Sequence, residues 1–276
     1  MTRSSRGGYG FRVEGVGSAQ RLLVDVPSDW PLLTLRTVLG FDAGHPVGVD
    51  DDRARIRVHD GLVEIDRRRG EALFTARQKP TPDALVHPHL APVAAIAARW
   101  RRHESFHAGA VILGDGAWAV MGAKGSGKSS LLAWLALSGH PVLTDDLLVI
   151  DADGNALAGP RSIDLREGAA QRFGVGEPLG VIGARERYRM VVAPVPAAFP
   201  LRGFIRLAWG GAPTVTPVPP AWRPAGLAAQ RAVRLIPRDP DLLVHLSALP
   251  MVELRRPREW GRAADAADQL LCALAS

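Results

Sequence analysis

The chain has 276 residues, 47% of them hydrophobic, which is enough for one large domain or two small ones with a buried core. Its net charge of +6 comes from arginine spread along the chain, and neither an aromatic-interleaved basic stripe nor a zinc-ligand spacing points to nucleic acid. A single cysteine, Cys272, excludes an internal disulfide, and no apolar run approaches the length of a membrane span. We therefore expect a cytoplasmic protein without a membrane or nucleic-acid partner, and a homo-oligomer stays open.

The N-terminal part predicts short strands. Residues 1–9 are rich in Arg, Ser and Gly, and we expect them to be disordered and not to form a signal peptide. Apolar or alternating runs then predict strands at residues 11–13, 22–26, 56–58, 62–65 and 72–76. These strands indicate a small β-rich N-terminal lobe over residues 1–80, which ends in a proline-containing linker at residues 79–82.

A helix is predicted after this linker. Asp83 is the expected N-cap of a helix over residues 84–100, which Pro88 would break or delay. His87 and His89 lie two residues apart, so a helix does not place them on one face, and we interpret both as structural.

The next segment has the order strand, glycine-rich loop, helix. An apolar run at residues 117–121 leads into the pattern G-x-x-x-x-G-K-[ST] at residues 122–129, and a helix-like run follows at residues 130–137. Glycines let backbone N–H groups surround phosphate oxygens, and a helix start favours an anion. We predict a phosphate loop that binds ATP through Gly122, Ala123, Lys124, Gly125, Ser126, Gly127, Lys128, Ser129 and Ser130.

Lysine usage supports this interpretation. The chain has only three lysines, Lys79, Lys124 and Lys128, and two of them fall inside the loop. A lysine offers phosphate a compact point charge that arginine does not. We expect Lys128 to reach the β- and γ-phosphates and Lys124 to be a solvated loop residue, and we expect the hydroxyl of Ser129 to bind Mg²⁺.

Two carboxylates follow the next predicted strand. Residues 141–144 form an apolar strand that ends in Asp145 and Asp146. Carboxylates at this place hold Mg²⁺ or take a proton from a hydroxyl group, and an ordinary strand-end turn is the alternative.

The remaining residues alternate between strands and helices. Arg185, Arg187 and Arg189 are predicted to lie in a charged loop that could cover a substrate, although solvated charge explains them equally well. Strands are expected at residues 160–166, 201–209, 214–218 and 251–254, and helices at residues 227–235, 241–249 and 260–275.

From His107 to Ile150 the chain resembles the HPr kinase/phosphorylase family. The features that carry the resemblance, in order, are His107-Ala108-Gly109, the predicted phosphate loop, Gly139-His140 and Asp145-Asp146. The resemblance implies an α/β fold with a P-loop, HPr-kinase-like core, which we assign to an ATP-binding domain over residues 81–276.

The resemblance also implies roles for individual residues. Asp146 would accept the proton of a substrate hydroxyl, His107 would lie near the transferred phosphate, and Asp145 would hold Mg²⁺, although the two aspartates could exchange these roles. The implied function is an ATP-dependent kinase that transfers the γ-phosphate to a serine-like hydroxyl of a protein, peptide or small molecule. The alternative is an ATP-binding switch or assembly protein without catalysis. The family's later glycine- and isoleucine-rich signature is not found, so phosphorolysis is not expected.

Overall fold

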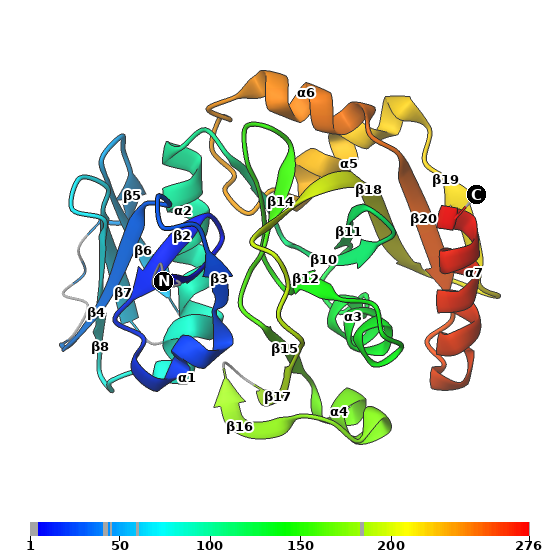
Figure 1. Cartoon of the computed structure of the whole chain (residues 1–276), viewed down its shortest axis with the longest axis horizontal. Coiled ribbons are helices and arrows are strands. Elements are labelled where there is room, and N and C mark those ends of the chain that lie inside the picture. The colour runs from blue at the N-terminus through cyan, green and yellow to red at the C-terminus, as the bar shows by residue number, and fades with distance from the viewer. Residues whose placement is uncertain (1–4, 41–43, 45, 59–60, 183–184, 276) are drawn as a thin grey trace.

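The computed structural model describes residues 5–40, 44, 46–58, 61–182 and 185–275, which form a mixed α/β protein (Figure 1). These residues contain three β-sheets and seven α-helices. The helices are α1 (Pro82–Ala84), α2 (Leu90–Trp100), α3 (Lys128–Leu137), α4 (Glu167–Phe173), α5 (Arg223–Gln230), α6 (Pro240–Ala248) and α7 (Ala263–Ala275). No helix of the described part is long and apolar enough to cross a membrane.

The first sheet forms the N-terminal lobe. Its strand order is β3-β1-β2-β4-β8-β7-β6-β5. The strands are β1 (Ser5–Gly8), β2 (Phe11–Glu14), β3 (Val24–Val26), β4 (Leu32–Leu39), β5 (Gly48–Val49), β6 (Arg53–Val58), β7 (Gly61–Asp66) and β8 (Glu71–Ala76). The strands of this sheet lie within residues 5–76; β2, β3, β6, β7 and β8 overlap predicted strands, whereas β1, β4 and β5 were not foreseen.

The predicted disorder of residues 1–9 is wrong for the part that the structure describes. Ser5–Gly8 pairs with β2 and β3, and the ring of Tyr9 is buried. The backbone N–H of Tyr9 also donates to Ala158 O at 2.6 Å. The polar and glycine-rich composition hid this strand, which forms a tight hairpin with the neighbouring β2 and also pairs with β3. Met1–Ser4 lie outside the described residues.

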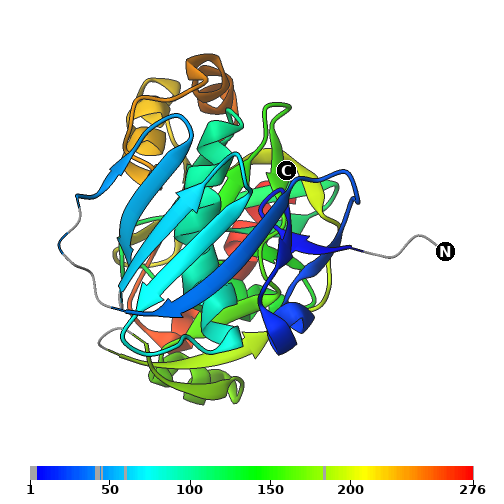
Figure 2. The same cartoon turned by 90° about the vertical axis from the view of Figure 1, so that its left-hand side faces the viewer.

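Helix α2 packs against the first sheet, as Figure 2 shows. Its apolar residues share one core with side chains such as Leu33 and Phe74. The helical segment begins earlier than predicted, because the hydroxyl of Thr81 accepts a hydrogen bond from Ala84 N at 3.2 Å and Thr81, not Asp83, is the N-cap. The segment is broken as predicted, since His87 has non-helical backbone angles inside the π-helical turn Leu85–His89.

The second sheet carries the residues that the sequence singled out. It consists of β9 (Glu104–Phe106), β10 (Ala108–Leu113), β11 (Gly116–Met121), β12 (Val142–Thr144), β13 (Leu148–Ile150), β14 (Asn155–Leu157), β18 (Ala198–Trp209), β19 (Thr214–Pro217) and β20 (Met251–Arg256). Strand β18 is parallel to both β11 and β20. The carboxyl ends of these three strands therefore meet at one edge of the sheet.

Helices cover both faces of this sheet. Side chains of α5 and α6 pack with Phe204 in one core, and side chains of α3 and α7 pack with Ile205 in another. Phe204 and Ile205 are consecutive residues of β18, so their side chains point to opposite faces of the sheet, as the pleat requires. Strand β11 is thus fixed from both sides just before the predicted phosphate loop.

The third sheet corrects one prediction. It has the order β15-β17-β16, with β15 (Ser162–Leu165), β16 (Glu177–Ile182) and β17 (Arg185–Val191). Arg185, Arg187 and Arg189 were expected in a loop, but they lie in β17, which pairs on both sides. A strand of alternating charge was not recognised because the alternation was read as solvated polarity.

Candidate functional site

The predicted phosphate loop connects β11 to α3, and its conformation requires glycine. Gly122, Gly125 and Gly127 have φ values of 153°, 87° and 83°, which side chains rarely tolerate. A Cβ atom on Gly122 would lie 2.7 Å from Ser126 Oγ, and one on Gly127 would lie 2.7 Å from Arg256 Nη2. Helix α3 begins directly afterwards at Lys128, so strand, loop and helix follow in the predicted order.

Hydrogen-bond donors gather around this loop. Lys128 Nζ donates to Gly122 O at 2.9 Å, and Arg256 Nη2 donates to Ser126 O and Gly127 O at 3.2 and 3.1 Å. Ser126 Oγ and Arg256 Nε are buried and, among the described residues, have no hydrogen-bond partner. Burial lowers the pKa of Lys128, and the nearby Asp146 and Asp145 oppose this shift. Buried donors without acceptors fit an anion as ligand.

Asp145 faces the start of α3. Its Oδ1 accepts a hydrogen bond from Ser129 Oγ at 3.2 Å, and its side chain is buried. Burial, with the neighbouring charge of Asp146 as the second cause, raises the pKa of Asp145 to about 6. A buried carboxylate with this environment is stabilised by a cation.

Asp146 is paired with His107. The ring Nδ1 of His107 lies 3.2 Å from Asp146 Oδ1 and 3.1 Å from Asp146 O. Asp146 has a φ of 69°, an uncommon left-handed conformation that aspartate tolerates better than most residues. The two side chains are 46% and 44% exposed, so both remain accessible from solvent. An uncommon backbone conformation at an exposed carboxylate is typical of functional sites.

These residues line a cavity of about 740 Å³, which we call the loop cavity. The predicted residues on its wall are His107, Lys124, Gly125, Gly127, Lys128, Ser129, Ser130, Asp145 and Asp146. Ser126 is buried within the loop. Gly122 and Ala123 lie on a second cavity of about 950 Å³, which we call the interlobe groove. The structure thus brings the predicted residues together from three separate segments of the chain.

Several cavity residues were not found from the sequence. Trp209 and Arg256 end strands β18 and β20, and Arg258 follows shortly after. The guanidinium groups of Arg256 and Arg258 lie 4.8 and 5.2 Å from the centre of the Trp209 ring, and Trp209 Nε1 donates to Gly125 O at 3.3 Å. Only knowledge that both strands run parallel to β11 would have placed them beside the loop.

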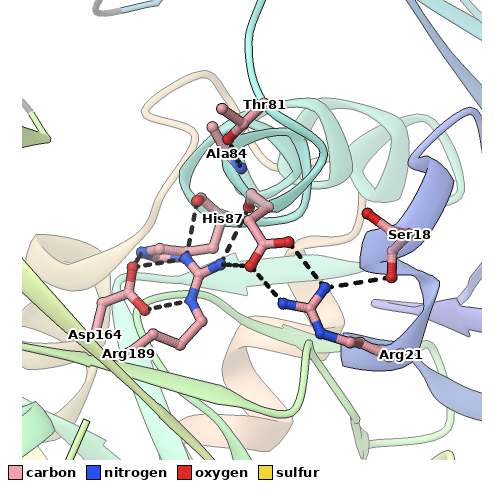
Figure 3. Close-up of polar contacts among 8 residues, drawn as sticks. Ser18, Arg21, Thr81, Ala84, His87, Asp164 and Arg189 are labelled. Atoms are coloured by element: carbon pink, nitrogen blue, oxygen red, sulfur yellow. Dashed lines mark hydrogen bonds and ion pairs between the residues drawn. The ribbon is translucent and has the colours of Figure 1, made fainter. Parts of the chain in front are cut away.

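A buried ion-pair network adjoins the cavity (Figure 3). Arg189 donates to both carboxylate oxygens of Asp164 at 2.8 and 2.9 Å, and these side chains are 3% and 5% exposed. His87 Nε2 lies 3.5 Å from Asp164 Oδ2, while Asp83 binds Arg21 of the N-terminal lobe at 2.7 and 2.9 Å. His87 was interpreted as structural, and it does lie within this network, but it also lines the loop cavity.

A divalent metal would have few protein ligands here. No group of three or more His, Cys, Asp or Glu side chains in the described residues is arranged to hold a metal ion. The hydroxyl of Ser129 and the carboxylate of Asp145 nevertheless form an oxygen pair beside the loop. Such a pair fits Mg²⁺, which in nucleotide sites is held by one or two protein oxygens, phosphate oxygens and water.

Comparison with known proteins does not establish a family. No family model matches the chain, and no curated protein is significantly similar to it. One solved structure that matches is the Hpr(Ser) kinase/phosphatase from Coxiella burnetii, at 11% identity and a TM-score of 0.34 over 62% of this chain and 97% of that chain. A likeness at this level establishes neither a shared fold nor a shared activity.

Proposed function

We propose that this protein is an ATP-dependent kinase that transfers the γ-phosphate to a serine-like hydroxyl group. The observation that carries the proposal is that two adjacent carboxylates differ in burial and in the groups they contact. Asp145 is buried and accepts a hydrogen bond from Ser129, whereas the carboxylate of Asp146 is accessible and lies 3.2 Å from His107 Nδ1. One aspartate is thus suited to a metal ion and the other to a substrate.

The triphosphate would lie in the loop cavity. Backbone N–H groups of the glycine-rich loop, Lys128, and Ser126 Oγ and Arg256 Nε, which have no partner among the described residues, would bind its oxygens. Ser129 and Asp145 would hold Mg²⁺, which supplies charge neutralisation at the β- and γ-phosphates when bound. Trp209 also lies at the cavity wall, where the guanidinium groups of Arg256 and Arg258 pack on its ring.

The transfer step follows from the position of Asp146. The acceptor hydroxyl oxygen bonds to the γ-phosphorus, its proton moves to an Asp146 carboxylate oxygen, and the bond from the γ-phosphorus to the β–γ bridging oxygen breaks with its electron pair on ADP. His107, at 3.2 Å from Asp146 Oδ1, orients this carboxylate. Lys128 neutralises the charge that develops during transfer.

The decisive experiment measures transfer of ³²P from γ-labelled ATP to pools of proteins, peptides and small hydroxyl compounds. The parent protein should label at least one pool in a Mg²⁺-dependent manner, and Asp146→Asn should label it far more slowly. Mg²⁺-dependent ATP binding without labelling of any pool would refute the kinase and support the non-catalytic switch instead.

A further inference from the structure

The interlobe groove extends from the N-terminal lobe to His107 and Asp146. Its walls are formed by β5, β6, α2 and residues 229–235. His107, Lys124 and Asp146 line both the groove and the loop cavity. A molecule in the groove therefore reaches His107 and Asp146 while the loop cavity holds a nucleotide.

One side of the groove is apolar. Ala91, Ala95 and Ile96 of α2 form part of its lining, together with the aliphatic side chains of Val47 and Leu235. Val47 and Leu235 are 55% and 40% exposed, so a ligand in the groove can contact both side chains. The groove is thus suited to a ligand with apolar side chains.

The groove also runs along the edge of the first sheet. Strand β5 is the last strand in the sheet order, and no further strand of the described residues pairs with its outer edge. It has only two residues, which pair with Arg55 and Ala54, so Ile56 of β6 extends beyond it into the groove lining. An exposed sheet edge can bind an extended peptide through backbone hydrogen bonds.

The charge of the groove is positive. Its lining contains Lys124, Arg55, Arg57, Arg231 and Arg234 against the single carboxylate of Asp146. Glu64 and Glu104, which lie outside the lining, pair with Arg55 and Arg231, and Lys124 and Arg234 leave an excess of positive charge over Asp146 even when Arg57 is not counted. This field attracts acidic groups and repels basic ones.

We propose that the interlobe groove binds an extended, acidic peptide segment and presents its serine hydroxyl to Asp146. Alternate side chains of a bound strand point to opposite sides, so apolar residues would contact α2 while acidic residues would contact the arginines. A sheet edge favours a peptide over a small hydroxyl compound, because only a peptide uses its backbone groups. This inference rests on the proposed kinase activity and specifies its acceptor.

The test uses a library of acetylated peptides with a central serine and randomised flanking positions, labelled with γ-³²P-ATP. We expect the labelled peptides to be enriched in Leu, Ile or Val together with Asp or Glu at the flanking positions. The kcat/KM of the best peptide should exceed that of the same peptide with its acidic residues replaced by Lys by at least about tenfold. N-methylation of the amides flanking serine should lower kcat/KM by about tenfold, since it removes backbone donors and leaves side chains intact.

Two variants test whether the interlobe groove causes the preference for acidic over basic peptides. Arg234→Glu should reduce the preference for acidic over basic peptides by about fivefold or more. Arg172→Glu, at an exposed position of α4 that lines neither cavity, should leave the preference unchanged. A preference for basic peptides, or an equal effect of both variants, would overturn the proposal.

Three further outcomes are distinguishable. Transfer to small hydroxyl compounds but to no peptide would refute the peptide groove and leave the kinase intact. N-methylated peptides that react as well as their parents would also refute strand-like binding. Mg-ATP binding without transfer to any acceptor would refute the kinase, and the groove proposal with it.

Discussion

Replacement of Asp145 by asparagine tests whether the protein gives up stability to keep the carboxylate that we propose as a ligand of Mg²⁺. Asp145 is buried, and within the described part of the chain its side chain accepts one hydrogen bond, from Ser129 Oγ at 3.2 Å, which asparagine must reproduce. Asparagine has nearly the same shape and keeps an acceptor oxygen, but it carries no charge. We expect Asp145→Asn to be more stable than the parent at neutral pH without metal and nucleotide.

The size of the effect follows from the raised pKa. Burial raises the pKa of Asp145 from 3.8 to about 6, so the folded chain holds this proton more tightly than the unfolded chain. Stability therefore falls as pH rises from about 4 to about 6 and then stays level. With about 1.4 kcal/mol for each pKa unit, the stability lost relative to low pH is about 3 kcal/mol at pH 8 and about half of that at pH 5.

Urea unfolding in EDTA at pH 5 and pH 8 measures this difference. The stability advantage of Asp145→Asn should be roughly 1–2 kcal/mol larger at pH 8 than at pH 5. Asp268→Asn is the matched control, because Asp268 is exposed on α7, and its effect should stay within about 0.5 kcal/mol. An advantage that does not change with pH, or a variant less stable than the parent at pH 8, would show that Asp145 is not a destabilising buried charge.

Four other substitutions test the site and its support. Lys128→Ala should lower ATP turnover by about 10²–10³-fold in a folded protein. If circular dichroism shows that the variant is folded and its ATP turnover is unchanged, residues 122–129 are not a phosphate loop. Ser129→Ala should remove about 1 kcal/mol of Mg²⁺-dependent ATP affinity measured by calorimetry, and equal losses with and without Mg²⁺ would count against it. Asp146→Asn should slow single-turnover transfer by about 10²–10⁴-fold with little change in ATP affinity; transfer at the parent rate excludes it as the base. Arg189→Met should cost about 3–5 kcal/mol in urea unfolding because Asp164 stays buried without its partner, and a loss below 1 kcal/mol would refute that.

Local signals in the sequence were sufficient for the centre of the site. The glycines of the loop, the apolar run before it and the helix after it lie within one continuous segment, and β11 and α3 occur where they were predicted. The strand before Asp145 and Asp146 was predicted in the same way. Short-range patterns succeed here because strand, loop and helix are each determined by neighbouring residues.

Tertiary structure decided what surrounds that centre. Trp209 and Arg256 reach the loop only because β18 and β20 run parallel to β11, and parallel pairing joins residues that are far apart in sequence. Strand β1 and the arginines of β17 were misread for a different reason: both strands pair antiparallel, but their polar composition resembles that of loops until the partner strands are known.

The sequence alone therefore determined the chemistry that the site offers, namely a glycine-rich loop, a lysine, a serine and two aspartates. It did not determine the positions of Arg189 or His87, whose partner Asp164 lies far along the chain. Nor did it show that α2 and the edge strand β5 form a groove that ends at Asp146. Residue identity limits which reactions a chain can perform, whereas long-range packing decides which side chains share a cavity and from which direction a second substrate can approach.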